Sequence, residues 1–294
     1  MSEVQAAAAC RELLGVRAVA IEPISDSASS VHRVALEDGR QVVVKIHSAR
    51  SGRAEAEKRA LICLAAHTDV RTPMVLACGK VPSSDTEALV LADLGPSNLG
   101  QLCGAGCCSR EEALEAIGSL LARIHRLPLD CGPGDPRRSR PRIPVEALSV
   151  HCPDSLKQIT DAVVSRAAEA ITKALPTTWC HGDLHPANVI PADHKIDAAS
   201  LHVVDLEQVA CTVPEYDVAQ SLVTSDALDL RGRAAVLRGY AASLDLELLD
   251  SFIAYQALRG WVYGATAERR DICLWTRRLA LAFQPFQQPT MQGG

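Results

Sequence analysis

The sequence predicts an α+β protein with two lobes: a five-stranded antiparallel sheet with a helix comes first, and a larger, mainly helical part follows. Three observations support this fold class. Residues 1–92 contain several β-rich runs, residues 99–294 follow mostly helical periodicity, and the turn-rich segment 93–98 separates them. A chain of 294 residues is long enough for each lobe to bury a core. We therefore expect lobes at 1–92 and 99–294, joined by a hinge linker at 93–98.

Five strands are predicted in the first lobe from runs of alternating or continuous apolar residues. They cover residues 18–24, 31–36, 41–46, 73–80 and 88–92. The Asp38-Gly39 pair after the second run is typical of a hairpin turn, so the first three strands should form an antiparallel meander. Helices are expected at residues 4–14 and 53–67, where apolar residues recur on one face.

The second lobe is predicted to be helical over residues 110–127, 153–174 and most of 218–282. A polar loop at 181–188 and a short strand at 201–204 interrupt the helices. Residues 131–144 are rich in Pro, Gly and Arg and lack an apolar period, so we expect an exposed loop there that could line a substrate pocket.

Composition limits the classes of partner. The chain is 48% hydrophobic and 22% charged, which is typical of a globular protein, and its net charge of −5 argues against a general nucleic-acid partner. No run approaches the roughly 18 apolar residues of a membrane span, and the first ten residues do not resemble a signal peptide. We expect a cytoplasmic protein without a membrane partner, either a monomer or a weak dimer.

The most informative stretch is residues 181–188, which read HGDLHPAN. The spacing of His181, Asp183 and Asn188 matches the H-x-D-x-x-x-x-N loop of phosphoryl-transfer enzymes. In that loop the Asp orients the attacking hydroxyl or accepts its proton, and the Asn holds a metal ion on the phosphates. The transferred phosphoryl group is already reactive, so positioning and charge are what the protein must supply.

Three further residues complete this chemistry. Lys45 is near the end of the third predicted strand and could reach a nucleotide phosphate, although an edge-strand lysine facing water is the alternative. A carboxylate on the following helix would pin this amine, and Glu57 is our first candidate before Glu55. Either acid could instead be a solvated charge. Asp205 ends a short strand 17 residues after Asn188 and could bind the same metal.

Other residues are candidates for ligand contacts. The main-chain groups of Ala92, Asp93 and Leu94 could hydrogen-bond an adenine, because a linker between lobes borders a crevice. Four acids in the helical half could bind the amines of a cationic substrate, although surface helices routinely carry such charges. These acids are Asp226, Asp229, Glu268 and Asp271.

Taken in order, these motifs resemble the aminoglycoside phosphotransferase and choline kinase-like family over residues 18–220. The resemblance is carried by Lys45, Glu57, the Asp93-Leu94 linker, the loop at 181–188, the Val204-Asp205-Leu206-Glu207 run and the Tyr216-Asp217-Val218-Ala219 run. It implies a protein kinase-like fold with a nucleotide-binding first lobe, a small-molecule substrate, ATP or alternatively GTP as donor, and Mg²⁺. It also implies that Asp183 is the catalytic base, that Asn188 and Asp205 are metal ligands, and that Lys45 contacts the nucleotide phosphates.

The same resemblance suggests supporting roles. His181 and Asp217 would be structural, and Asp217 would brace the loop by hydrogen bonds. Glu207 could assist the metal, and His185 could touch the substrate or merely pack. Family members commonly contact phosphate through a Ser/Gly-rich loop, and here the glycine-free loop offers Ser27, Ser29 and Ser30.

We therefore expect an ATP-dependent O-phosphotransferase that acts on a small, cationic molecule. The first candidate substrate is an antibiotic of the aminoglycoside or a related basic class, and its phosphorylation would confer resistance. A metabolic kinase for an amino-alcohol, sugar or amino acid is the alternative, and a non-catalytic nucleotide-binding module is the remote one. The short stretch between Glu207 and Tyr216 has no room for a protein-kinase activation segment, which argues against protein substrates.

Overall fold

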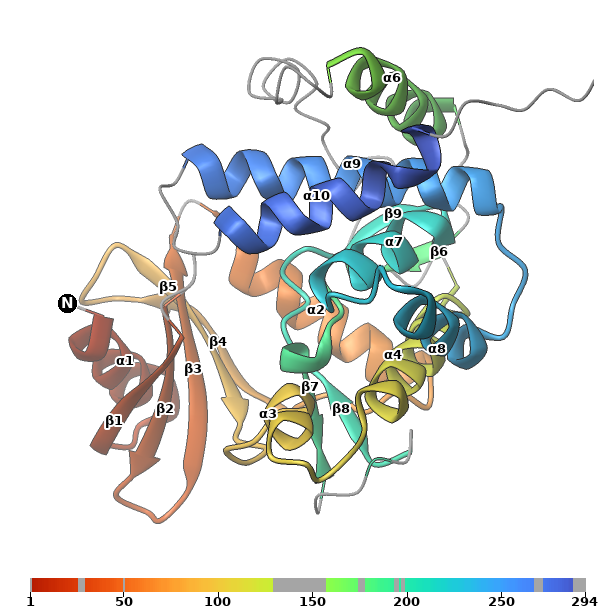
Figure 1. Cartoon of the computed structure of the whole chain (residues 1–294). Helices are drawn as coiled ribbons and strands as arrows, with labels where there is room; N and C mark the ends of the chain where they lie inside the picture. The colour runs from red at the N-terminus through yellow and green to blue at the C-terminus, as the bar shows by residue number, and fades with distance from the viewer. Residues whose placement is uncertain are drawn as a thin grey trace, which may run out of the picture.

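The computed structural model describes residues 2–25, 30–49, 51–128, 157–173, 178–192, 196, 199–266 and 272–287. Within these residues a β-sheet is formed by the first part of the chain, and most of the helices come after it (Figure 1). The predicted α+β class with a five-stranded antiparallel sheet is confirmed.

The sheet has the strand order β1-β2-β3-β5-β4, and every neighbouring pair is antiparallel. Its strands are β1 (Ala18–Ser25), β2 (Ser30–Leu36), β3 (Gln41–Ser48), β4 (Val75–Val81) and β5 (Thr86–Ala92). Gly39 has a φ of 85° in the turn between β2 and β3, a conformation that glycine adopts without steric cost. The predicted meander of the first three strands is therefore present.

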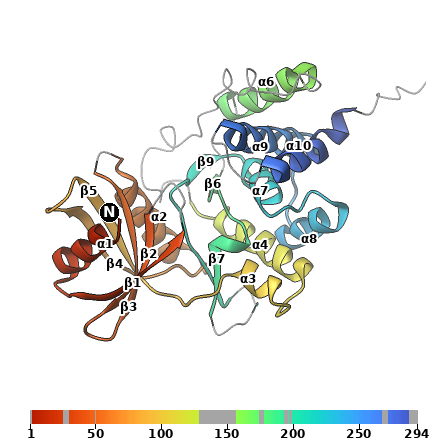
Figure 2. The ribbon, with the colours of Figure 1, turned by 60° about the vertical axis from the view of Figure 1, so that its left-hand side comes forward.

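The two faces of the sheet pack against different helices. Val42, Val44 and Ile46 on β3 pack with α1 (Ser2–Ala9) and the π-helix Cys10–Leu14, which together cover one face. The predicted helix at 4–14 is thus two helical segments. Successive side chains of a strand point to opposite faces, so Val43 and Lys45 point the other way. On that side the helix α2 (Arg53–His67) lies between the sheet and the rest of the molecule (Figure 2).

Residues 93–98 run from β5 to α3 (Leu99–Gly104) without helix or strand. The helix α3 begins at Asn98, whose side chain accepts a hydrogen bond from Gln101 N, while the Gln101 side chain accepts one from Asn98 N. This helix was not predicted from the sequence, because six residues are too few to show a period. Assigning 93–98 as the hinge between two lobes stays a prediction.

The second part contains α4 (Arg110–Ile124), α6 (Lys157–Lys173), α7 (Pro214–Thr224), α8 (Leu230–Tyr240), α9 (Leu246–Thr266) and α10 (Ile272–Gln287). Two short antiparallel strand pairs lie between α6 and α7 in the sequence. They are β6 (Thr178–Cys180) with β9 (Ala210–Thr212), and β7 (Val189–Pro191) with β8 (Leu201–Val203). The predicted loop at 131–144 lies outside the described residues. Among the helices that the structure describes, none has the length and apolar character needed to cross a membrane.

Candidate active site

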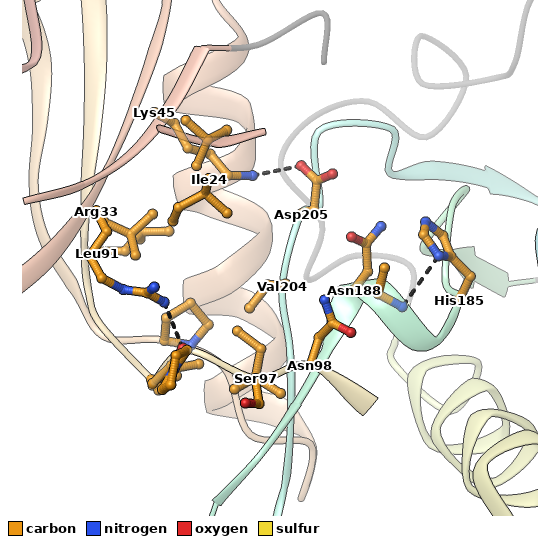
Figure 3. Close-up of a pocket in the computed structure, with 18 of the residues that line it drawn as sticks. Ile24, Arg33, Lys45, Leu91, Ser97, Asn98, His185, Asn188, Val204 and Asp205 are labelled. Carbon is orange, nitrogen blue, oxygen red and sulfur yellow. Dashed lines mark hydrogen bonds and ion pairs between the residues drawn. The ribbon is translucent and has the colours of Figure 1, made fainter. Parts of the chain in front are cut away.

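A cavity of about 680 Å³ lies where the sheet, the 93–98 segment and the loop at 181–188 meet (Figure 3). Alternate residues of β2 and β3 supply one wall, and α7 and α10 contribute at another. Its lining includes the ionisable and amide side chains of Lys45, Asp183, His185, Asn188, Asp205 and Arg278. The structure thus gathers residues that are up to 233 positions apart, from Lys45 to Arg278, around one space.

Lys45 bridges two carboxylates at this cavity. Its Nζ lies 2.6 Å from Glu57 Oε1 and 2.6 Å from Asp205 Oδ1, and it is only 5% exposed. Burial alone would lower the pKa of Lys45, but the charges and hydrogen bonds of Glu57 and Asp205 outweigh it, so the pKa is raised. The ammonium therefore stays charged, and the ion pair that we expected between Lys45 and Glu57 is present.

The carboxylate of Asp205 is held at the cavity by an uncommon backbone conformation. Asp205 has a φ of 67°, in the left-handed region that costs a non-glycine residue energy. Burial would raise the pKa of Asp205, but the charge of the Lys45 ammonium and its hydrogen bond to Asp205 lower this pKa by more. The net shift is therefore downward. Figure 3 shows Asp205 facing Lys45 across the space between the sheet and the loop. Asp205 is therefore an ionised oxygen donor near neutral pH.

Asp183 and Asn188 are joined within the loop. The side-chain Nδ2 of Asn188 donates to the backbone oxygen of Asp183 at 2.9 Å, which leaves the amide Oδ1 of Asn188 available as a ligand. Gln220 on α7 points its Nε2 at Asp183 Oδ1 at 3.4 Å, and His185 Nε2 is 4.0 Å from Asp183 Oδ2. Sequence reasoning missed Gln220, since a polar residue inside a helix carries no local signal of such a contact.

These residues fit a magnesium ion. Mg²⁺ prefers hard oxygen ligands such as carboxylates and amide carbonyls, and it often keeps phosphate and water as its other ligands. Asn188 and Asp205 offer one amide oxygen and one carboxylate at the same cavity. Glu207 does not line the cavity, but its charge acts on the pKa of both His47 and Glu57.

A buried carboxylate braces the loop from behind. Asp217 accepts hydrogen bonds from His181 N at 2.7 Å and from Gly182 N at 2.8 Å, and it lies 3.1 Å from His125 Nε2. The bracing role expected for Asp217 is confirmed by these contacts. Burial would raise the pKa of Asp217, but the hydrogen bond and charge of His125 help to keep it below its ordinary value.

His125, Cys180 and Asp217 bring three ligand-type atoms within 4.8 Å of one another. A metal would need the Cys180 thiolate, yet burial raises the pKa of this thiol well above its ordinary value. Together with the three hydrogen bonds already made by Asp217, this favours a structural role for the cluster.

The segment expected to hold adenine lines the same cavity with Ala92, Asp93 and Leu94. The backbone N–H of Ala92 already donates to Met74 O at 2.9 Å, so this donor is engaged. Arg33 Nε donates to Asp93 Oδ2 at 2.8 Å, and Arg33 Nη2 donates to the backbone oxygen of Gly95 at 2.7 Å. Arg33 was not anticipated from the sequence, because the contact joins residues 60 positions apart.

Of the remaining candidates, Ser30 and Asp229 do not line the cavity. The hydroxyl of Ser30 lies 2.7 Å from His32 Nε2, while Ser27 and Ser29 fall outside the described residues. Asp229 caps α8 and pairs with Arg110 at 2.6 Å, away from the cavity, and this hydrogen bond helps to lower the pKa of Asp229 to about 2.

Asp226, another acid expected to bind amines, does not line the cavity. Asp226 pairs with Arg277 and Arg278 at 3.5 Å each. Glu268 and Asp271 lie outside the described residues.

Comparison with known proteins finds solved structures with a similar fold. Two of the solved structures with a similar fold are the GDP and kanamycin complex of APH(2")-IIia, at 15% identity with a TM-score of 0.67, and a choline/ethanolamine kinase family protein from Mesorhizobium loti, at 15% identity with a TM-score of 0.67. The first similarity covers 96% of this chain and 98% of the other, and the second covers 98% and 96%.

A spectinomycin phosphotransferase, APH(9)-Ia, in complex with ADP and spectinomycin is also similar, at 13% identity with a TM-score of 0.58, over 97% of this chain and 94% of the other. These likenesses confirm the predicted protein kinase-like fold. Comparison with curated protein sequences gives no significant match. The sequence pattern of the phosphotransferase enzyme family matches residues 20–261, which is most of the chain. The chain therefore belongs to the phosphotransferase enzyme family, and it is a phosphotransferase.

Proposed function

We propose that this protein transfers the γ-phosphoryl group of ATP to a hydroxyl of a small molecule, with Mg²⁺ as cofactor. The observation that carries the proposal is the bridge from Lys45 to Asp205 at 2.6 Å across a cavity that Asp183 also lines. An ammonium, a metal-binding carboxylate and a separate carboxylate at one cavity are what in-line phosphoryl transfer requires.

Each residue has a role in this proposal. Asp183 orients the acceptor hydroxyl and takes its proton, while Gln220 limits the rotation of the Asp183 carboxylate. Lys45, pinned by Glu57, contacts the phosphate oxygens. Asn188 and Asp205 hold Mg²⁺, which neutralises phosphate charge when it is bound. The segment from Ala92 to Leu94 binds the nucleotide base.

The donor nucleotide is testable by thermal shift. We expect ATP with Mg²⁺ to raise the melting temperature, because a ligand that binds only the folded state stabilises it. GTP belongs in the same experiment, since one similar protein was solved with GDP and another with ADP. A larger shift with GTP would reassign the donor and leave the acceptor chemistry unchanged.

The acceptor is testable by nucleoside diphosphate release over a panel. The panel contains basic antibiotics such as kanamycin and spectinomycin, which two of the similar proteins bind, and metabolic amino-alcohols, sugars and amino acids. If a basic antibiotic is the acceptor, phosphorylation adds about two negative charges to a cationic drug, and resistance in cells expressing the protein is the expected consequence. The non-catalytic alternative predicts nucleotide binding without turnover of any compound.

Asp183→Ala tests the chemistry. We expect kcat to fall by at least about 10²-fold with nearly normal nucleotide binding, because the substitution removes the base but not the phosphate contacts. Asp85→Ala, an exposed acid outside the cavity, is the matched control and should keep full activity. Equal turnover by wild type and Asp183→Ala would show that Asp183 is not the base.

A further inference from the structure

Three cysteines lie close together in the sequence, at the turn between α3 and α4, and none of them lines the cavity. Cys103 is in the last turn of α3, and Cys108 lies just before α4. The turn is closed by two backbone hydrogen bonds, from Gly106 N to Cys103 O at 3.0 Å and from Cys107 N to Leu102 O at 2.9 Å. The local backbone therefore holds Cys103 and Cys108 near each other.

The sulfur atoms of Cys103 and Cys108 are in contact. The Cys108 thiol donates to Cys103 Sγ at 3.2 Å, and the Cys103 thiol donates to the backbone oxygen of Ser109 at 3.3 Å. Both are free thiols that are partly buried and pack against the main hydrophobic core, whereas Cys107 is exposed. A disulfide has an S–S distance of about 2.05 Å, so the two sulfurs need to approach by only about 1.2 Å to form this bond.

A zinc site is a weaker interpretation of this pair, because structural zinc is bound by four ligands. Within the described part of the chain, the ligand-type atoms that gather in a group of three within 4.8 Å belong to His125, Cys180 and Asp217, at another place in the molecule. Among the same described residues, Cys103 and Cys108 have no third Cys, His, Asp or Glu ligand at such a distance. Their chemistry is therefore that of two thiols in contact.

We propose that Cys103 and Cys108 form a redox modification site, at which a small-molecule disulfide such as oxidised glutathione converts the two thiols into an intramolecular disulfide. Cys103 attacks one sulfur of the small molecule and releases the first small thiol. Cys108 then attacks the Cys103 sulfur of this mixed disulfide and releases the second small thiol. The protein loses two electrons and two protons, and the two released thiols carry them away.

The order of attack follows from the surroundings of Cys108. Burial raises the pKa of Cys108 to about 12, and the hydrogen bond and charge of Cys103 act in the same direction. Cys108 is thus protonated near neutral pH and is the slower of the pair to attack an oxidant, because the thiolate is the nucleophile. Once Cys103 is in a mixed disulfide, its sulfur no longer carries a charge, and Cys108 lies beside the sulfur that it attacks.

The disulfide would act on α3, the helix that lies against the loop at 181–188. A Cβ at Gly100 would be 3.6 Å from Pro186 Cβ and 3.8 Å from Ala187 N. Asn98, which caps the start of the same helix, lines the cavity. A cross-link across the turn at 104–107 limits the freedom of the unfolded chain, so we expect the oxidised protein to unfold at a higher temperature.

The test is oxidation of the full-length protein with oxidised glutathione, followed by alkylation of the free thiols and peptide mapping. Trypsin gives one peptide, 81–110, that contains all three cysteines. We expect this peptide to lose two hydrogen atoms, to carry a modification on Cys107 alone, and to regain the two other thiols after reduction. Glutathione adducts on Cys103 or Cys108 without an intramolecular bond, or alkylation of all three cysteines, would overturn the proposal.

Serine variants locate the bond. Cys107→Ser should form the disulfide as wild type does, whereas Cys103→Ser and Cys108→Ser should not. Cys108→Ser still has two thiols in the turn, but its reaction should stop at a glutathione adduct on Cys103. A cross-link that forms as readily in Cys108→Ser as in wild type would show that the contact between Cys103 and Cys108 does not direct the reaction. The peptide map of wild type tests the proposal even if a variant does not fold.

The melting temperature gives a second measurement. Oxidation should raise it by about 2–4 °C in wild type and in Cys107→Ser, and dithiothreitol should reverse the rise. Cys108→Ser should show no rise, which separates this disulfide from oxidation of other cysteines. An unchanged or lower melting temperature of the cross-linked protein would refute the stabilising effect on α3. Neither measurement involves phosphoryl transfer, so the result is independent of the proposed function.

Discussion

At the scale of single residues, the loop at residues 181–188 contains a backbone conformation that only a few residue types tolerate. Gly182 has a φ of 81°, and a Cβ at this position would collide with the backbone oxygen of Gln208. Its N–H donates to Asp217, so the glycine lies between the brace and the neighbouring Asp183. Both the dihedral angle and the close approach therefore require glycine.

We predict that Gly182→Ala destabilises the fold by about 1–3 kcal/mol, because it combines an unfavourable φ with a steric overlap. The displaced loop should also lower kcat at least about tenfold, since catalytic groups act only within narrow geometric limits. Urea unfolding and initial rates measure the two effects. Gly104→Ala is the control, because a Cβ there meets no atom within 4 Å. Normal activity of Gly182→Ala would mean that the loop does not need this geometry.

At the scale of elements, the helices α4 and α8 approach each other through two glycines. A Cβ at Gly118 would collide with the backbone oxygen of Val236, and one at Gly239 would collide with that of Glu115. This packing also serves the active site. His125 follows the end of α4, and its Nδ1 lies 2.9 Å from the hydroxyl of Tyr240 on α8, while its Nε2 contacts Asp217. The helix pair thus positions the residue that supports the loop brace.

Gly239→Ala is predicted to cost about 1–3 kcal/mol, because a well-packed contact must open to admit a methyl group. Activity should fall as well, through displacement of His125. Chemical denaturation and rate measurements at a temperature where the variant is folded separate the two effects. Arg238→Ala on the same helix removes only an exposed ion pair with Glu115 and should cost no more than about 0.5 kcal/mol. A loss of similar size in both variants would contradict the close-packing argument.

At the scale of the whole molecule, four buried or partly buried histidines are expected to make stability depend on pH. Burial lowers the pKa of four histidines below the ordinary value near 6.5, namely His32, His47, His185 and His202. A group with a lower pKa in the folded state binds fewer protons when folded than when unfolded. Its contribution to stability is therefore fully present above about pH 6.5 and is lost as the pH falls below it.

We predict that the melting temperature falls as the pH is lowered from 7.5 to 5.5. Burial raises the pKa of Glu57, which acts in the opposite direction and reduces the slope without reversing it. Differential scanning calorimetry over this range measures the effect. His47→Gln should flatten the profile, whereas His67→Gln, at an exposed histidine, should leave it as in wild type. A melting temperature that rises on acidification would show that the histidines do not dominate.

Much of the fold follows from local patterns. The strand containing Lys45 and the helix containing Glu57 could be predicted, because periods of 2 and 3.6 residues indicate which face of a strand or helix is buried. The α3 helix and the three-residue strands β6 and β9 could not, since so few residues show no period. Their formation depends on partners far along the chain, as in the pairing of Trp179 with Cys211.

The sequence by itself determined which residue types the candidate site offers and predicted their chemistry, because the residue types and spacing of Asp183 and Asn188 are local properties of one loop. Only the tertiary structure decided which charges meet. Asp226 could have bound an amine, but folding brings Arg278 to it from 52 positions away and adds that arginine to the cavity lining. The physical reason is that a side chain's charge can be read from its residue type, whereas its partner and its solvent exposure depend on long-range packing.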